Sequence, residues 1–131
     1  MSTSSSDSIL NTIKKMLGLD PEYDAFDQEL VVFINTSLSN LHQIGVGPAD
    51  GFMINGSEES WSELLPSDVT PSIQNVKSYI YITVKMLFDP PGATNHSNAL
   101  NESLKELTWL ISTKREEDRH DPGTIDIVTS N

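Results

Sequence analysis

The sequence predicts an all-α protein: a small four-helix bundle with long central helices, a long loop that could contain a short hairpin, and a flexible C-terminal tail. Apolar residues recur at helical spacing in four segments, and proline and glycine separate those segments. A chain of 131 residues suffices for one domain that buries roughly two-thirds of its unfolded surface. We therefore expect a disordered N-terminus over residues 1–7, a helical domain over 8–115 and a flexible tail over 116–131.

The first two helices are expected over residues 8–17 and about 24–44. Gly18 and Gly45 follow them as stop signals, and Asp20-Pro21 opens the second segment. The second helix has an apolar stripe at 3.6-residue spacing, made of Phe26, Leu30, Phe33, Ile34, Leu41 and Ile44. Residues 45–70 then form a loop, because glycine and proline recur throughout it. Within this loop, residues 51–56 could form a short strand or hairpin, and residues 57–65 one or two helical turns.

The third long helix, over residues 71–88, is the most apolar segment. Thr70-Pro71 supplies a cap and a first-turn proline, and Pro90-Pro91 ends the helix. One face carries Ile73, Val76, Ile80, Val84 and Leu87, while Tyr79, Tyr81, Ile82 and Met86 cover most of the rest. A helix that is apolar nearly all round is buried. We expect this helix to organise the core and to leave apolar surface for subunit contacts.

The last helix is expected over about residues 97–115. Leu100, Leu104, Leu107 and Ile111 align on one side, and Trp109 lies on the opposite side. Trp109 could cover a neighbouring loop or contact another subunit, because tryptophan is enriched in interface hot spots. Trp61 could likewise anchor the loop on the core or reach a partner. Tyr79 and Tyr81 suit either core packing or a subunit seam.

The chain is strongly acidic, with a formal net charge of −11 and no basic residue between Lys15 and Lys77. Nucleic-acid-binding proteins need clustered lysine and arginine, so tight direct binding of nucleic acid is not expected. The acidic surface could serve solubility alone, or it could repel DNA or steer a basic partner. Candidate residues for an acidic lumen or outer surface are Asp24, Asp27, Glu29, Glu58 and Glu59.

The sequence contains no catalytic, cofactor-binding or metal-binding motif. Cysteine is absent, and His42, His96 and His120 do not share a metal-ligand spacing. There is no nucleophile elbow and no phosphate-binding loop. We therefore predict a protein that is not an enzyme and needs no cofactor or metal. The Ser/Thr-rich start lacks a secretory signal and Lys85 interrupts the best apolar run, so synthesis in the cytoplasm without membrane insertion is expected.

Several segments together resemble the phage head–tail connector (adaptor) proteins, in the branch common in phages of Gram-positive bacteria. The main ones are residues 76–91 (VKSYIYITVKMLFDPP) and 104–111 (LKELTWLI). Upstream, residues 23–27 (YDAFD), Ile34-Asn35 and the loop with Gly45, Gly47, Phe52 and Trp61 follow the same order. The resemblance covers about residues 8–112.

This resemblance implies a structural virion protein, made in the host cytoplasm and located in the neck between head and tail. Such proteins form closed rings of identical subunits, expected here to be dodecameric. The ring docks beneath the portal protein, extends the DNA channel without sequence-specific DNA binding, and carries a stopper or tail-completion protein. Expected subunit or portal contacts are Tyr79, Tyr81, Trp109, Trp61, Phe52, Ile125 and Ile127.

The C-terminal tail and the charge leave alternatives open. Residues 124–129 alternate apolar and polar side chains, so Ile125 and Ile127 could add an edge strand to a partner, or the tail could simply be disordered. The acidic charge would also suit a DNA mimic that inhibits a DNA-binding protein. A small helical regulatory or toxin-neutralising protein is a further alternative.

Overall fold

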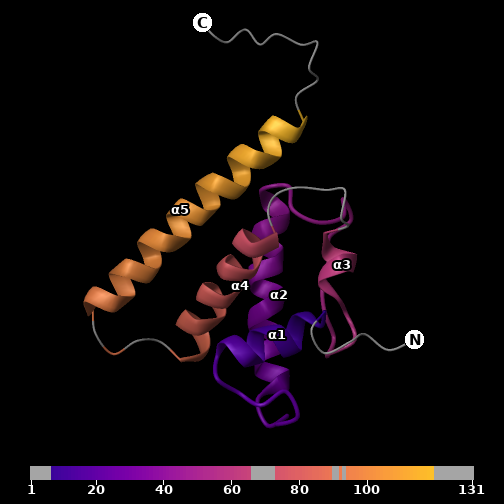
Figure 1. The fold of residues 1–131 in the computed structure, drawn as a ribbon, viewed down its shortest axis with the longest axis vertical. Helices are drawn as coiled ribbons and strands as arrows, with labels where there is room; N and C mark the ends of the chain where they lie inside the picture. Colours follow the sequence, from indigo (N-terminus) through magenta and orange to yellow (C-terminus); the bar gives the residue numbers. More distant parts are fainter. Residues whose placement is uncertain (1–6, 66–72, 90–91, 93, 120–131) are drawn as a thin grey trace, which may run out of the picture.

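Five helices make up the regular structure of the part of the chain described by the computed structural model. It describes residues 7–65, 73–89, 92 and 94–119, with side chains except those of Thr94 and residues 113–119. The helices are α1 (Ile9–Met16), α2 (Asp27–Gln43), α3 (Trp61–Leu64), α4 (Ile73–Phe88) and α5 (Thr94–Arg119) (Figure 1). The all-α prediction is confirmed, with α3 as a single turn in the expected loop.

Glycine ends both of the first two helices by the same hydrogen-bond pattern. After α1, Gly18 has φ +86°. Its N–H donates to the Lys15 carbonyl, and the N–H of Leu19 donates to the Lys14 carbonyl. After α2, Gly45 has φ +92°, and Val46 N–H returns to the Leu41 carbonyl. These paired bonds satisfy carbonyls that a helix end would leave free, in a conformation that favours glycine. The predicted stops at Gly18 and Gly45 are confirmed.

The short helix α3 ties the loop to the N-terminus. A capping box starts it: Ser60 Oγ accepts from Glu63 N–H at 3.1 Å, and the Glu63 carboxylate accepts from Ser60 N–H at 2.9 Å. Ile9 N–H donates to the Glu59 carbonyl at 3.1 Å, and Trp61 N–H to the Asp7 carbonyl at 2.9 Å. An antiparallel bridge between Ser8 and Ser60 results. The two segments thereby hold each other in place.

The loop before α3 does not form the short strand or hairpin considered for residues 51–56. The backbone N–H and carbonyl of Ile54 form hydrogen bonds with the Asn35 side chain instead of with a neighbouring strand. Asn35 Nδ2 donates to the Ile54 carbonyl at 2.9 Å, and Asn35 Oδ1 accepts from Ile54 N–H at 2.8 Å. Since the amide side chain satisfies these groups, the Ile54 side chain can be fully buried without a partner strand.

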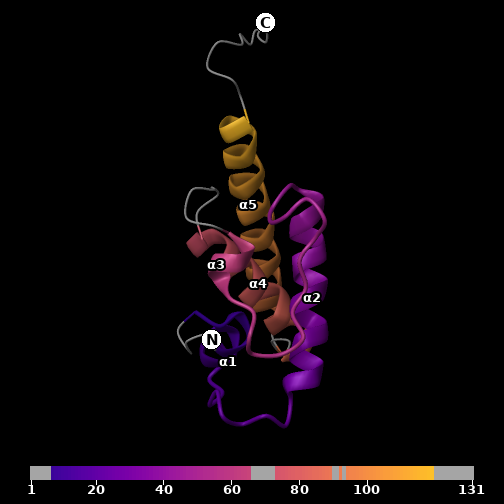
Figure 2. The same ribbon diagram turned by 90° about the vertical axis from the view of Figure 1, so that its right-hand side faces the viewer.

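Helix α4 lies in the middle of the molecule, and α2 and α5 each pack mainly on it (Figures 1 and 2). Val76, Ile80 and Val84 are fully buried, as the predicted apolar face requires. On α5, Ile111 is fully buried, and Leu104 and Leu107 pack partly buried against the core. Leu87, placed on the same α4 face by its spacing, is 48% exposed because it lies in the last turn of the helix. The central helix therefore organises the core, as predicted.

Two helix boundaries differ from the expectation. Helix α2 begins at Asp27 rather than Asp24. The preceding residues form two turns, from Asp20 to Tyr23 and from Asp24 to Asp27. Phe26, which was expected in the apolar stripe, is instead the N-cap residue and is 37% exposed. Helix α5 extends from Thr94 to Arg119 instead of 97–115. Its last turns are rich in Lys, Arg and Glu, which favour helix without an apolar stripe. Residues 116–119, predicted as flexible tail, are helical, and Asp7, predicted as disordered, bonds to Trp61 and Ser62; residues 1–6 and 120–131 lie outside the described residues.

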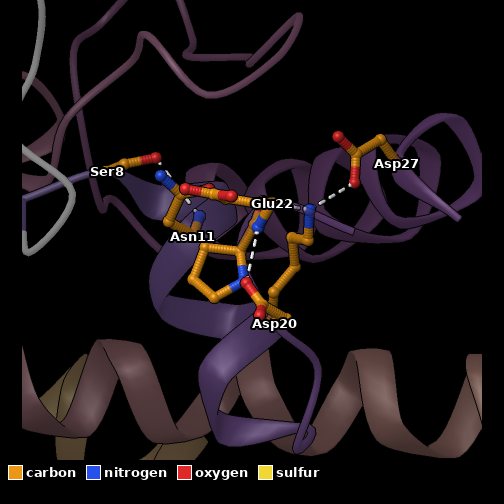
Figure 3. A network of polar contacts seen from close by, with 7 residues as sticks. Ser8, Asn11, Asp20, Glu22 and Asp27 are labelled. Carbon is orange, nitrogen blue, oxygen red and sulfur yellow. Dashed lines mark hydrogen bonds and ion pairs between the residues drawn. The ribbon is translucent and has the colours of Figure 1, made fainter. Parts of the chain in front are cut away.

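A buried ion pair joins α1 to α2. Lys14 Nζ lies 2.8 Å from Asp27 Oδ1 and donates to the Pro21 carbonyl at 2.8 Å. The Lys14 side chain is 1% exposed and that of Asp27 32%. Asp27 is labelled in Figure 3, beside the turn in which Glu22 N–H donates to the Asp20 carboxylate at 2.9 Å. The pair fixes the linker between the two helices.

Candidate assembly interface

The layered arrangement gives the molecule two outer helical faces on opposite sides. Because α4 lies between α2 and α5, the side of α2 that faces away from α4 and the side of α5 that faces away from α4 point in different directions (Figures 1 and 2). A head-to-tail contact between identical subunits needs two different complementary surfaces of this kind. Each of these two faces carries exposed apolar side chains.

The outer face of α5 carries the most exposed tryptophan. Trp109 is 64% exposed and the neighbouring Leu110 39%. Lys105, one turn before Trp109 on the same face, is 76% exposed and lies 3.6 Å from Glu102, a weak surface pair. We call Lys105, Glu106, Trp109 and Leu110 the α5 edge. The exposure of Trp109 agrees with its expected position opposite the apolar stripe.

The outer face of α2 forms a shallow hollow of about 410 Å³. Its lining consists of Val32, Asn35, Thr36, Ser39, Asn40 and Met53, which we call the α2 groove. Val32 is 59% exposed and Met53 68%, so two apolar side chains flank polar but uncharged ones. Met53 is positioned by the loop, since the adjacent Ile54 is held by the two Asn35 hydrogen bonds.

A third apolar surface lies where the chain enters α2 and leaves α4. The rings of Tyr23 and Phe26 meet edge-to-face at 5.8 Å, and those of Phe26 and Phe88 at 5.1 Å. Tyr23 is 51% exposed, and Leu87 in the same turn of α4 as Phe88 is 48% exposed. Aromatic contacts of this geometry stabilise the joint by about 1 kcal/mol each. Phe88 packs partly buried against the core, while Tyr23 and Phe26 extend this cluster onto the exposed surface.

The aromatic residues predicted from the sequence as contact residues differ in how far they are exposed. Trp61 is 3% exposed, donates its indole N–H to Thr12 Oγ1 at 2.9 Å, and has Lys77 Nζ 5.3 Å from its ring. It therefore anchors the loop on the core, one of its two expected roles. Tyr79 is 9% exposed, and Tyr81 and Phe52 are partly buried against the core. Trp109 alone of the five lies largely in solvent; Ile125 and Ile127 lie outside the described residues.

The five candidate acidic residues do not form one class. Asp24, Glu29 and Glu58 are exposed. Asp27 pairs with the buried Lys14, and Glu59 accepts from Asn55 N–H at 3.0 Å and from Gly56 N–H at 3.4 Å. Asp27 and Glu59 therefore hold the local structure, whereas the other three belong to the acidic surface.

No cluster of three metal-ligating side chains occurs among the described residues. A second hollow, of about 770 Å³, is lined by residues of α5 alone, which are Asn98, Asn101, Glu102, Leu104, Lys105 and Thr108. One helix cannot enclose a ligand, so this hollow is open surface. The hydrogen bond to Asp89, at 3.0 Å, raises the pKa of Lys85 above its ordinary value. No helix in the described ranges is long and apolar enough to cross a membrane.

Sequence reasoning missed the α2 groove and the Lys14–Asp27 pair. Val32 stands outside the apolar stripe of α2, and Met53 lies in a loop, so nothing in their spacing marks them as neighbours. Lys14 lies one residue after Ile13 in a short amphipathic helix, and the turn at Gly18 brings Pro21 back over it. The one available signal was Val32, an apolar residue that helical spacing places off the apolar stripe of α2.

A family model described as phage connector protein matches residues 9–118, which is most of the chain. The chain belongs to the phage connector protein family. This family consists of structural phage proteins, so the chain is a phage structural connector protein. The resemblance to phage connector proteins seen in the sequence is thereby confirmed. No curated protein and no solved structure is found to match the chain.

Proposed function

We propose that this connector protein forms a closed, homo-oligomeric ring in the neck of a tailed phage. The ring docks on the portal protein, extends the DNA channel, and serves as the platform for a stopper or tail-completion protein. The observation that carries this proposal is the family match over residues 9–118, which includes every described helix from α1 to nearly the end of α5. No catalytic step is part of the proposal.

The surfaces of the monomer support assembly. A subunit of this size leaves large apolar side chains in solvent on α2, α5 and at the Tyr23–Phe26 joint. Contiguous exposed apolar surface commonly marks protein contacts. Because the outer faces of α2 and α5 lie on opposite sides of α4, repeated head-to-tail contacts can close into a ring.

The charge suits a passage for DNA. Asp24, Glu29 and Glu58 are exposed carboxylates in a chain with a formal net charge of −11. A bore that presents such groups repels phosphates, so DNA slides through it without being held. We propose that part of this acidic surface lines the channel. A ring whose bore is lined by lysine and arginine would contradict this assignment.

Deletion of the gene from the phage tests the proposal. We expect capsids that package DNA but neither retain it stably nor carry attached tails, and we expect plasmid-supplied wild-type protein to restore infectious particles. Negative-stain images and infectivity counts measure both effects. Tailed, filled and infectious particles without the protein would contradict the proposed function.

A further inference from the structure

We propose that the α5 edge of one subunit sits in the α2 groove of the next subunit in the ring. This inference rests on the proposed ring and adds which two surfaces make its repeated contact. The groove is occupied by a second copy of this chain, and Trp109 is the central side chain of the contact.

Position favours this pairing over contact within one chain or between like faces. Most of the α2 groove lies on α2 and the α5 edge lies on α5, and α4 separates these two helices (Figures 1 and 2), so a single copy cannot join them. Two copies that join edge to groove leave one free edge and one free groove at their ends. Each further copy can then add in the same way, which is the condition for a heterologous ring.

Charge also favours a second copy as the occupant. Subunits with a formal net charge of −11 repel one another, so contact between them is least costly where carboxylates are absent. None of the six side chains that line the α2 groove is charged. The exposed Glu29 lies beside it, one turn before Val32 on α2. No basic residue lies between Lys15 and Lys77, so the acidic groups beside the groove have no lysine or arginine from the same stretch of chain.

Helix α5 places an exposed lysine beside the apolar side chains of the α5 edge. Lys105 is 76% exposed on the same face as Trp109. A neighbour's α5 edge therefore brings an apolar side chain to an uncharged hollow, with one positive charge beside it for an acidic group such as Glu29. Such complementarity steers and orients association.

The groove is built to receive a side chain without rearrangement. Asn35 spans α2 and the loop with two hydrogen bonds to Ile54, at 2.8 and 2.9 Å, so Met53 is held beside the helix. Thr36 Oγ1 already donates to the Val32 carbonyl at 3.0 Å, so this hydroxyl needs no partner from outside. A preformed hollow loses less conformational freedom on binding. Tryptophan brings a large apolar area with few rotatable bonds.

Cysteine cross-linking tests this contact directly, since the natural chain contains no cysteine. We place one thiol in the groove, Thr36→Cys, and one on the α5 edge, Glu106→Cys, both at exposed positions. The double variant is supplied to the gene-deleted phage, and purified particles are oxidised and analysed on non-reducing gels. We expect a ladder of covalent multimers from the double variant. Each single variant, which is the matched control, should remain monomeric.

The outcomes separate this inference from the proposed function. Double-variant protein that is present in particles and gives no ladder overturns the edge-in-groove contact while the connector role stands. Wild-type protein that is absent from particles overturns both. As a second test, Trp109→Glu should lower incorporation into particles at least tenfold, and Trp109→Phe should retain it, with thermal unfolding showing that both variants fold. Full incorporation of Trp109→Glu would also overturn the contact.

Discussion

The ion pair between Lys14 and Asp27 predicts an asymmetric response to loss of its two members. Asp27→Ala leaves the Lys14 ammonium, 1% exposed, with only the Pro21 carbonyl among its described partners. Breaking a buried pair from one side costs about 3–5 kcal/mol. Because the Asp27 side chain is 32% exposed, water can reach the vacated position. We therefore expect the free energy of unfolding to fall by about 3 kcal/mol, at the lower end of this range.

Lys14→Met should cost less, although it removes the more buried residue. Methionine keeps most of the apolar stem and removes the charge, and the partly exposed Asp27 side chain can turn its buried Oδ1 toward water. The hydrogen bond to the Pro21 carbonyl is lost, which costs about 1 kcal/mol. Urea unfolding followed by circular dichroism at neutral pH gives both values. Glu29→Ala is the matched control: it removes an exposed carboxylate from the same first turn of α2 and should cost about 0.5 kcal/mol.

Two results would refute this reasoning. If Lys14→Met destabilised the protein as much as Asp27→Ala, the cost would come from lost packing rather than from an unpaired buried charge. If Asp27→Ala cost no more than Glu29→Ala, the ion pair would contribute nothing beyond the helix dipole. A double variant with both substitutions should resemble Lys14→Met, because no buried ammonium remains.

Three further predictions follow from particular contacts. Ile80→Ala, at a fully buried position of α4, should lower the free energy of unfolding by about 3 kcal/mol in urea, and a loss below 1 kcal/mol would argue against a central α4. Asn35→Ala leaves both backbone groups of Ile54 without their partner and should lower the free energy of unfolding by about 2 kcal/mol. Hydrogen exchange of the Ile54 amide should accelerate, and unchanged exchange would contradict the role of the two Asn35 hydrogen bonds. In Trp61→Phe, Trp109 is the remaining tryptophan, so fluorescence of the free subunit should be that of a solvent-exposed indole and shift to shorter wavelength in the ring. An unshifted spectrum in assembled rings would exclude Trp109 from a buried contact.

The helices could be predicted because each of their signals is local. Gly18 and Gly45 act on the backbone within a few residues, and the α4 stripe of Val76, Ile80 and Val84 repeats at helical spacing. The extension of α5 to Arg119 could not be read from a stripe, because charged residues continue a helix without one.

The surfaces could be predicted only in part. The exposed position of Trp109 follows from the helical spacing of α5. Trp61 could not be assigned from sequence, because its burial depends on Thr12, which lies 49 residues earlier in the chain. The α2 groove depends on Asn35 meeting Ile54 across 19 residues, and no periodic pattern records such a contact. Non-local side-chain hydrogen bonds therefore set the limit of what the sequence reveals about the site.

Cryo-electron microscopy of the neck in intact phage particles tests the central claim most directly. The map should contain a closed ring of subunits with this five-helix fold between the portal and the tail, with a central passage for DNA. The α5 edge of each subunit should contact the α2 groove of its neighbour. A neck in which no ring of this fold is present, in particles that are complete and infectious, would contradict the account.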